Sequence, residues 1–147
     1  MPVAVGLAMT MPGLPVVWQG DEFGLTGIDG EDSRTPLPWS SIGDAAERIA
    51  LYSRLAALRS HTPLAEGGLR WLHASGEAIA FAREAPEGVL VVVATRSAGA
   101  VYVGVDLSDA SVVVVEGTAS ADSSTVTTGG AAFAVWSLSG ATAPAWD

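Results

Sequence analysis

The stretch GLPVVWQGDEFGLTG, residues 13–27, joins a short apolar run to a loop that is rich in glycine and acidic residues. Its run Val16-Val17-Trp18 is brief and β-prone, and glycine and proline flank it, which is typical of a strand buried on both faces of a parallel sheet. The apolar residues 3–11 before it predict a short buried helix that ends at Pro12. The sequence therefore predicts a helix followed by a buried strand.

The residues that follow complete a βα unit. Residues 23–41, FGLTGIDGEDSRTPLPWSS, predict a long loop, and loops of this length in compact domains are usually functional or disordered. Asp44 and Glu47 have the spacing of a capping box, and apolar residues then recur at helical spacing. We expect an amphipathic helix over residues 44–60. Strand, loop and helix form one βα unit, the building block of barrels and doubly wound sheets.

Beyond Pro63 the apolar pattern changes from helical to alternating, and turn signals such as Ser75-Gly76 interrupt it. The predicted strands are residues 69–73, 77–83, 89–94, 101–107, 112–115 and 132–138. Short strands without helices between them predict an antiparallel β-sandwich or barrel. Residues 117–131 are polar and rich in Gly, Ser and Thr, and we expect them to form a mobile hairpin loop.

The chain thus divides into two parts of different class, with a boundary near residues 62–68. We predict an α+β protein with domains at residues 1–62 and 63–147. A buried parallel strand needs neighbours on both edges and cover on both faces, which residues 1–62 do not supply. We therefore expect further polypeptide upstream, and we expect residues 1–147 alone to associate, because the apolar residues 3–18 lack cover.

Composition narrows the classes of partner. The chain has 147 residues, enough to bury a core, and its 16 acidic and 7 basic residues give a net charge of -9. A basic patch for nucleic acid is missing, and prolines break the only long apolar run, so we expect neither a nucleic-acid nor a membrane partner. There is no cysteine and no secretory signal pattern, and a cytoplasmic location is our working expectation.

The adjacent carboxylates Asp21 and Glu22 are the first candidates for catalysis. Glycoside hydrolysis needs two carboxyl groups about 5 to 5.5 Å apart in retaining enzymes, and about 6.5 to 9.5 Å apart in inverting ones. Side chains that are neighbours in a strand point to opposite faces, so this pair is badly arranged for one bond. We interpret Gly20-Asp21-Glu22 as strand-to-loop architecture, in which a carboxylate accepts hydrogen bonds from backbone N–H groups or arginine.

Other chemical groups are scattered. His61 and His73 are isolated from one another, and the acidic residues 29–32 lack the spacing of a calcium loop, so we expect no metal and no cofactor. The aromatic residues of the alternating strands are expected in the core; they are Trp71, Phe81, Phe133 and Trp136. Trp39 differs, because it lies in a proline-flanked loop where its ring can face a ligand.

Two segments resemble a known family. MPGLPVVWQGDEFGLTG is similar to the region around the eighth barrel strand of alpha-amylase superfamily glycoside hydrolases, where the pattern is G-x-P-x-x-x-x-G-x-E. Its four defined positions are Gly13, Pro15, Gly20 and Glu22. The following GEDSRTPLPW resembles a loop of bacterial alpha-glucosidases, cyclomaltodextrinases and maltogenic amylases, and its matching positions are Asp32, Arg34, Pro36, Pro38 and Trp39. It departs from the Asp-Pro-Asp of some relatives, since residues 30–32 read Gly-Glu-Asp.

The resemblance implies the last βα unit of a TIM barrel, followed by an antiparallel β-sandwich. It also implies that the nucleophilic Asp, the acid/base Glu and the third catalytic Asp lie upstream, so this chain is expected to hold no catalytic residue. Gly20, Asp21 and Glu22 are then structural residues of the barrel rim. Asp32 and Arg34 line the glycone side of the sugar cleft, and for Arg34 both sugar contact and loop bracing stay open.

Two functions follow from this reading. In the first, the chain is the C-terminal part of a retaining alpha-glucan glycosidase, and its partners are alpha-linked glucose oligosaccharides and the missing barrel polypeptide. In the alternative, it is a stand-alone, non-catalytic β-sandwich that binds oligosaccharide or a partner protein.

Overall fold

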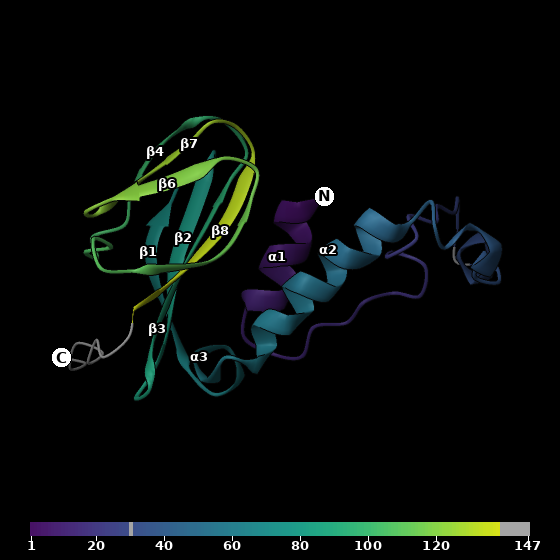
Figure 1. The fold of residues 1–147 in the computed structure, drawn as a ribbon, viewed down its shortest axis with the longest axis horizontal. Helices are drawn as coiled ribbons and strands as arrows, with labels where there is room; N and C mark the ends of the chain where they lie inside the picture. Colours follow the sequence, from purple (N-terminus) through teal and green to yellow (C-terminus); the bar gives the residue numbers. More distant parts are fainter. Residues whose placement is uncertain (30, 139–147) are drawn as a thin grey trace.

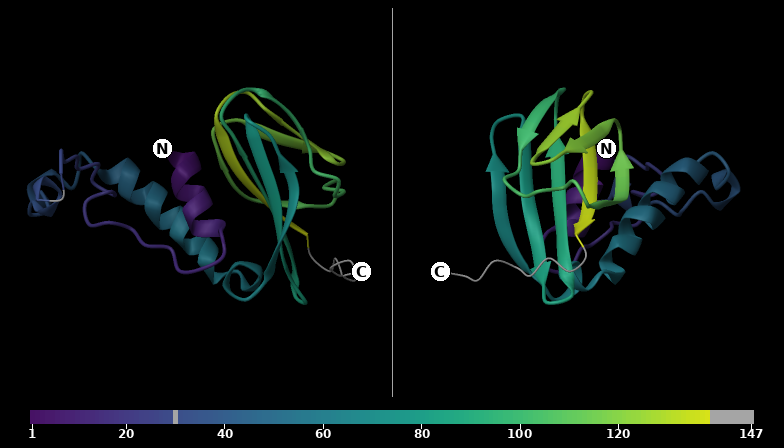
Figure 2. Two further views of the ribbon diagram at one scale, coloured as in Figure 1. Left: turned by 180° about the vertical axis from the view of Figure 1, so that it is seen from behind. Right: turned by 60° about the vertical axis from the view of Figure 1, so that its left-hand side comes forward.

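The computed structural model describes residues 1–29 and 31–138, with only the backbone described for Ser33. Helices cover one face of a five-stranded sheet, and a three-stranded sheet covers the other face (Figure 1). The two further views show the same order of layers, with the long loop before α2 furthest from the sheets (Figure 2). The structure is therefore a β-sandwich with helices packed on its larger sheet.

The helical layer consists of α1 (Pro2–Thr10), α2 (Ala46–Ala57) and α3 (Thr62–Ala65), with short 3-10 turns η1 (Asp32–Arg34), η2 (Trp39–Ser41) and η3 (Leu58–Ser60). Helix α1 confirms the predicted N-terminal helix. The predicted capping box is wrong, because α2 begins at Ala46, after Ala45 at the N-cap, and has no side-chain cap. Asp44 belongs to the preceding turn, in which its backbone N–H donates to the Ser41 carbonyl at 3.0 Å.

The strands form two antiparallel sheets. The larger has the order β1-β2-β3-β8-β5 and the smaller the order β4-β7-β6. Their bounds are β1 (Gly68–Ala74), β2 (Ala78–Ala85), β3 (Gly88–Thr95), β4 (Gly99–Tyr102), β5 (Ser111–Glu116), β6 (Ala119–Asp122), β7 (Thr125–Thr128) and β8 (Ala132–Leu138). The predicted sandwich is confirmed, although β4 is shorter than the strand predicted over residues 101–107.

Residues 117–131 differ from the loop predicted for them. They hold the hairpin β6–β7, which turns at Ser123 with φ 49°. The hairpin forms because alternation along β7 turns Val126 and Thr128 inward, where both are buried. The Gly, Ser and Thr content hid this alternation, and β-branched threonine suits a strand as well as a loop.

Two apolar cores lie on opposite faces of the larger sheet. Along β2, Phe81 packs among residues of the helices, whereas Ala80 and Ala82 pack between the sheets. Phe81, Phe133 and Trp136 are buried as predicted. Trp71 is not, since it is 53% exposed, although its ring meets Phe81 edge-on at 5.6 Å. Its strand β1 is at the edge of the sheet, so no further strand covers it.

Helix α1 lies directly on the sheet because residue 6 is glycine. A Cβ atom at Gly6 would lie 2.5 Å from the ring of Phe133 on β8. Any larger residue would push the helix away from the sheet, since a buried aromatic ring has little room to move. Gly6 therefore sets the distance between the helical layer and the sandwich.

The predicted strand at residues 16–18 is absent. These residues pass along α2 without joining a sheet, and Val16 and Trp18 are 78% and 57% exposed. A strand needs a neighbouring backbone to complete its hydrogen bonds, and none of the described residues pairs with this run. The β-prone sequence is present, but the edge that it needs is not in the described part of the chain.

Candidate functional site

The acidic pair lies in a tight turn at residues 20–24. The Gly20 backbone N–H donates to Glu22 Oε2 at 3.1 Å, and the Phe23 N–H donates to the Gly20 carbonyl at 3.0 Å. Gly20 has φ 100°, and a Cβ atom there would lie 2.7 Å from the Leu25 side chain. Glu22 therefore serves as an acceptor within its own turn, whereas Asp21 is exposed.

The same turn faces Tyr52 of α2 across a hollow of about 410 Å³, which also contains Arg48. Burial raises the pKa of the Tyr52 phenol, and the negative charge of Asp21 raises it further. Arg48 lowers this pKa and Glu22 raises it. The negative charges of Asp21 and Glu22 thus favour the uncharged form of the Tyr52 hydroxyl, which lies in the middle of α2.

Asp32 and Arg34 lie on η1, within the long loop. Asp32 Oδ2 accepts a hydrogen bond from the Ile28 N–H at 3.4 Å, and Arg34 pairs with Glu31 at 3.4 Å. Asp29 accepts hydrogen bonds from the backbone N–H groups of Asp32 and Glu31, which lower the pKa of Asp29. The loop is thus braced by local contacts, and the guanidinium of Arg34 remains largely exposed.

Trp39 lies at the start of η2 and is 67% exposed. Its ring meets Phe23 edge-on, with centroids 5.9 Å apart and an interplanar angle of 84°. This contact brings Trp39 to the turn that holds Glu22. No hydrogen bond, ion pair or ring contact among the described residues joins Trp39 to Asp32 or Arg34, so the predicted site residues form two groups rather than one.

The described residues offer neither a metal-binding cluster nor a membrane-spanning helix. No group of three or more His, Asp or Glu side chains suited to a metal occurs among residues 1–29 and 31–138. His61 precedes α3 and His73 is in β1. Within the same residues, no helix combines the length and apolar character that crossing a bilayer requires.

Two polar features of the structure were not predicted from the sequence. One is a hollow of about 570 Å³ beside α2, where Arg54 and Glu116 pair at 2.8 Å. The partners are 62 residues apart, so no local pattern indicates their contact. The other is Arg83 of β2, which is buried and donates to backbone carbonyls. The sequence did contain a sign of Arg83, because in the strand AIAFAREA an arginine stands at a position where the alternation predicts a buried apolar residue.

No family model matches the chain. Two curated proteins are similar to part of it. An amylopullulanase of Thermoanaerobacter thermohydrosulfuricus is 30% identical over 87 residues, which are 58% of this chain and 6% of that protein. A neopullulanase 2 of Thermoactinomyces vulgaris is 32% identical over 81 residues, which are 54% of this chain and 14% of that protein. The chain thus corresponds to a small fraction of the length of these relatives.

A solved structure of another protein has a similar fold. The debranching enzyme from Nostoc punctiforme superimposes with a TM-score of 0.74 and 19% identity, covering 93% of this chain and 30% of that one. The two curated relatives confirm the resemblance to the alpha-amylase superfamily that the sequence predicted, and the solved structure shows the fold.

Proposed function

From its similarity to alpha-amylase superfamily enzymes, we propose that this chain is the C-terminal part of a retaining alpha-glucan glycoside hydrolase, of the alpha-glucosidase or alpha-amylase type. It would serve carbohydrate metabolism when joined to a barrel. The observation that carries the proposal is the sequence match to two alpha-glucan enzymes, together with a fold likeness that covers 93% of the chain. A cytoplasmic location is part of the proposal.

The bond-breaking carboxylates, in this proposal, belong to polypeptide outside the chain. Glu22 already accepts a hydrogen bond from its own turn, and Glu84 is buried in an ion pair with Arg70. A complete barrel takes about 250 residues, which is more than residues 1–62 can supply. The exposed apolar residues Leu14, Val16 and Trp18 are then covered by the barrel strands that this segment joins.

The loop residues supply contacts to sugar. An exposed indole such as Trp39 offers a flat apolar face, and the fork of Arg34 donates to hydroxyl groups or holds a carboxylate. Asp32 accepts hydrogen bonds from hydroxyl groups. In this proposal they act on substrate binding rather than on the chemical step, because the bond-breaking carboxylates belong to the missing barrel.

The experiment compares residues 1–147 with the same chain joined to its upstream reading frame. We expect no hydrolysis of maltooligosaccharide or of an aryl alpha-glucoside by residues 1–147, and hydrolysis with retention by the longer protein. In the longer protein, Arg34→Ala should raise KM about tenfold, the scale of one lost charged hydrogen bond. Trp39→Ala should raise KM several-fold, because the apolar face against the sugar ring is lost. Arg96→Ala, which changes an exposed residue after β3, is the matched control. Turnover by residues 1–147 alone would refute the proposal.

The alternative is a non-catalytic β-sandwich that binds oligosaccharide. The exposed Trp71 on edge strand β1 favours it, since an uncovered indole suits a sugar ring. Titration calorimetry of residues 1–147 with a maltooligosaccharide separates the two functions. Saturable binding without turnover, weakened by Trp71→Ala, Trp39→Ala or Arg34→Ala, together with no upstream barrel, would support the alternative.

A further inference from the structure

The starting observation is a buried guanidinium whose partners are all backbone carbonyls. Arg83 is 2% exposed and donates to the carbonyl of Thr10 at 2.7 Å, of Gly67 at 2.9 Å and of Leu64 at 3.1 Å. Its Nε donates to the Gly68 carbonyl at 3.2 Å. The four acceptors come from the end of α1, from α3, from the turn after α3 and from the start of β1. One side chain of β2 therefore joins three elements.

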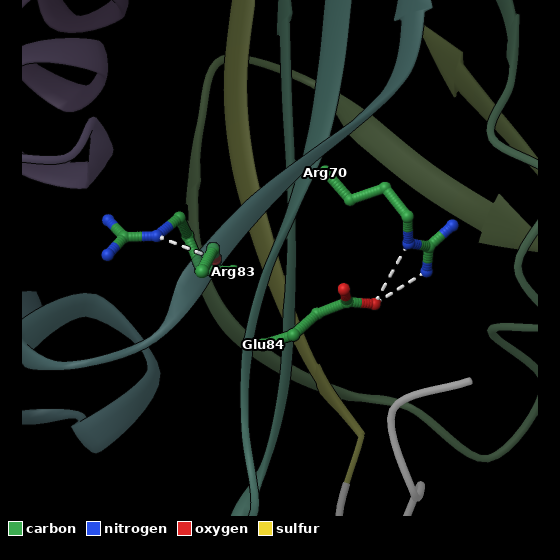
Figure 3. A network of polar contacts seen from close by, with 4 residues as sticks. Arg70, Arg83 and Glu84 are labelled. Carbon is green, nitrogen blue, oxygen red and sulfur yellow. Dashed lines mark hydrogen bonds and ion pairs between the residues drawn. The ribbon is translucent and has the colours of Figure 1, made fainter. Parts of the chain in front are cut away.

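The position of Arg83 separates this junction from the core between the sheets. Figure 3 shows the guanidinium of Arg83 on the opposite side of β2 from the Arg70–Glu84 pair. That pair is joined at 2.6 Å, with the Glu84 side chain buried. Among the described residues, no carboxylate pairs with Arg83, so the carbonyls at the ends of α1 and α3 compensate its charge. Burial, and then the charge of Arg59, lower the pKa of Arg83.

A second arginine holds the residues that follow α1. Arg59 of η3 donates to the carbonyl of Met11 at 3.3 Å and of Gly13 at 3.0 Å. Thr10, Met11 and Gly13 are thus held by two guanidinium groups that come from different layers. Arginine suits this task because its fork presents five donors in a fixed plane. The backbone that leaves α1 has little freedom where it enters residues 14–29.

The turn before β1 is built closely around this junction. A Cβ atom at Gly67 would lie 2.4 Å from the Pro63 carbonyl oxygen and 2.6 Å from the Glu84 carbonyl oxygen. Only glycine allows the chain to pass here, because both neighbours are backbone atoms that cannot rotate away. The close approach places the Gly67 carbonyl 2.9 Å from Arg83.

We propose that Arg83 and Arg59 form a clamp that fixes the backbone leaving α1 to the β-sandwich, so that the sandwich orients the loop carrying Asp32, Arg34 and Trp39. Arg83 is a positioning residue in this scheme and touches no substrate. The clamp itself stands on the contacts given above, and only its effect on sugar binding rests on the proposed function.

Hydrogen exchange of residues 1–147 by mass spectrometry tests the clamp. Arg83→Lys keeps the charge but loses the fork, and Arg83→Met keeps the bulk without donors. Both should speed exchange in residues 2–10 and 62–67 at least about tenfold, the scale of one lost charged hydrogen bond. Residues 88–95 and 132–138 should change less than about twofold, because the face of β2 between the sheets is untouched. Equal acceleration in all four regions, or wild-type exchange in Arg83→Lys, would overturn the clamp.

Chemical rescue separates the clamp from a general loss of packing. Arg83→Ala leaves a space lined by carbonyl oxygens, so millimolar ethylguanidinium should restore slow exchange in residues 2–10, whereas ethylammonium should not. Equal effects of both cations would refute the need for a planar fork. If Arg83→Ala does not fold, Arg59→Lys, at a half-buried site, takes its place, and faster exchange confined to residues 2–13 is the expected result.

The effect on sugar binding is tested in the protein extended by its upstream reading frame. Arg83→Lys should raise KM for a maltooligosaccharide several-fold, with kcat less affected, while Arg96→Lys leaves both unchanged. An unchanged KM beside the expected exchange pattern would refute the orientation of the loop and leave the clamp. Absence of alpha-glucan activity in the extended wild type would instead refute the proposed function, while the exchange result for the clamp would stand.

Discussion

Two apolar runs of similar composition differ in how far they are buried. Val91-Val92-Val93 in β3 is buried completely, whereas Val16-Val17-Trp18 is largely exposed. The first run lies between β2 and β8, which supply hydrogen bonds along both edges. The second run has no paired neighbour among the described residues. Buried strands are thus made by their neighbours, and a β-prone sequence alone is insufficient.

The same contrast extends to polar contacts. In the sandwich, the partly exposed Arg70 pairs with the buried Glu84 at 2.6 Å, whereas both Arg34 and Glu31 are exposed and pair at 3.4 Å. We therefore expect equal substitutions to have unequal effects in residues 68–138 and in the loop region, which we define as residues 11–45. Three matched pairs of changes and one titration test this expectation, and in the third pair the packed position is Gly6 of α1, the helix that lies on the sandwich.

The largest contrast should come from phenylalanine. Phe81→Ala removes a fully buried ring and should lower the free energy of unfolding by about 3–5 kcal/mol. Phe23→Ala in the loop region loses mainly one edge contact with Trp39 and should cost about 0.5–1.5 kcal/mol. Urea unfolding of residues 1–147, monitored by circular dichroism, measures both changes in the free energy of unfolding. Equal losses would mean that the loop region is packed as tightly as the sandwich.

Arginine gives the second contrast. Arg70→Ala leaves the buried Glu84 carboxylate without its cation and should cost about 3 kcal/mol. Glu84 Oε2 already lacks a partner in the described structure, so the site has no spare donor. Arg34→Ala breaks an exposed pair and should change stability by less than about 0.5 kcal/mol. The double change Arg70→Met with Glu84→Met should recover most of the loss, and failure to do so would argue against a charge effect.

Glycine gives the third contrast. Gly6→Ala should cost about 1–3 kcal/mol, because the added methyl group meets the buried ring of Phe133. A Cβ atom at Gly43 meets nothing within 4 Å, so Gly43→Ala should be neutral or stabilising by up to about 1 kcal/mol. Thermal unfolding of the two variants provides the measurement. A neutral Gly6→Ala would show that α1 is not seated on the sheet as described.

The smallest contrast is expected between the pKa values of two exposed carboxylates, Asp106 and Asp29. Hydrogen bonds from the Ser108 hydroxyl and backbone N–H lower the pKa of Asp106 in the sandwich, whereas hydrogen bonds from the backbone N–H groups of Asp32 and Glu31 lower that of Asp29. Both carboxylates favour the folded state above their usual pKa of 3.8 and lose this effect as the pH falls through the lowered value. Ser108→Ala should raise the midpoint of Asp106 and leave that of Asp29 unchanged. Carboxyl NMR titration would contradict this if both midpoints moved together.

Much of the architecture was predictable, and the exceptions have physical reasons. Alternation identified the strands of the larger sheet, because burial on one face leaves a period of two in the sequence. It failed at residues 16–18, since the sequence does not show which edge is available. Residues 117–131 were misread because composition outweighed the alternation around Val126. Trp71 was placed in the core without knowledge that β1 is an edge strand.

The candidate site was less predictable than the fold. The family resemblance pointed to Asp32 and Arg34, and the proline-flanked loop pointed to Trp39, but neither could show that Trp39 contacts Phe23 while Asp32 and Arg34 lie apart from it on η1. Arg83 stands in a strand pattern that reads as apolar, and its acceptors lie up to 73 residues away. Contacts of this range are set by the packing of the layers, which a one-dimensional pattern does not contain.

The larger sheet ends in two irregular strands. Strand β1 shifts register between Trp71 and His73, and β5 shifts between Val112 and Val114. Such β-bulges bend an outer strand out of the flat geometry that a second molecule needs for adding its own strand. Both outer strands of this sheet are therefore poor templates for edge-to-edge aggregation with a second molecule.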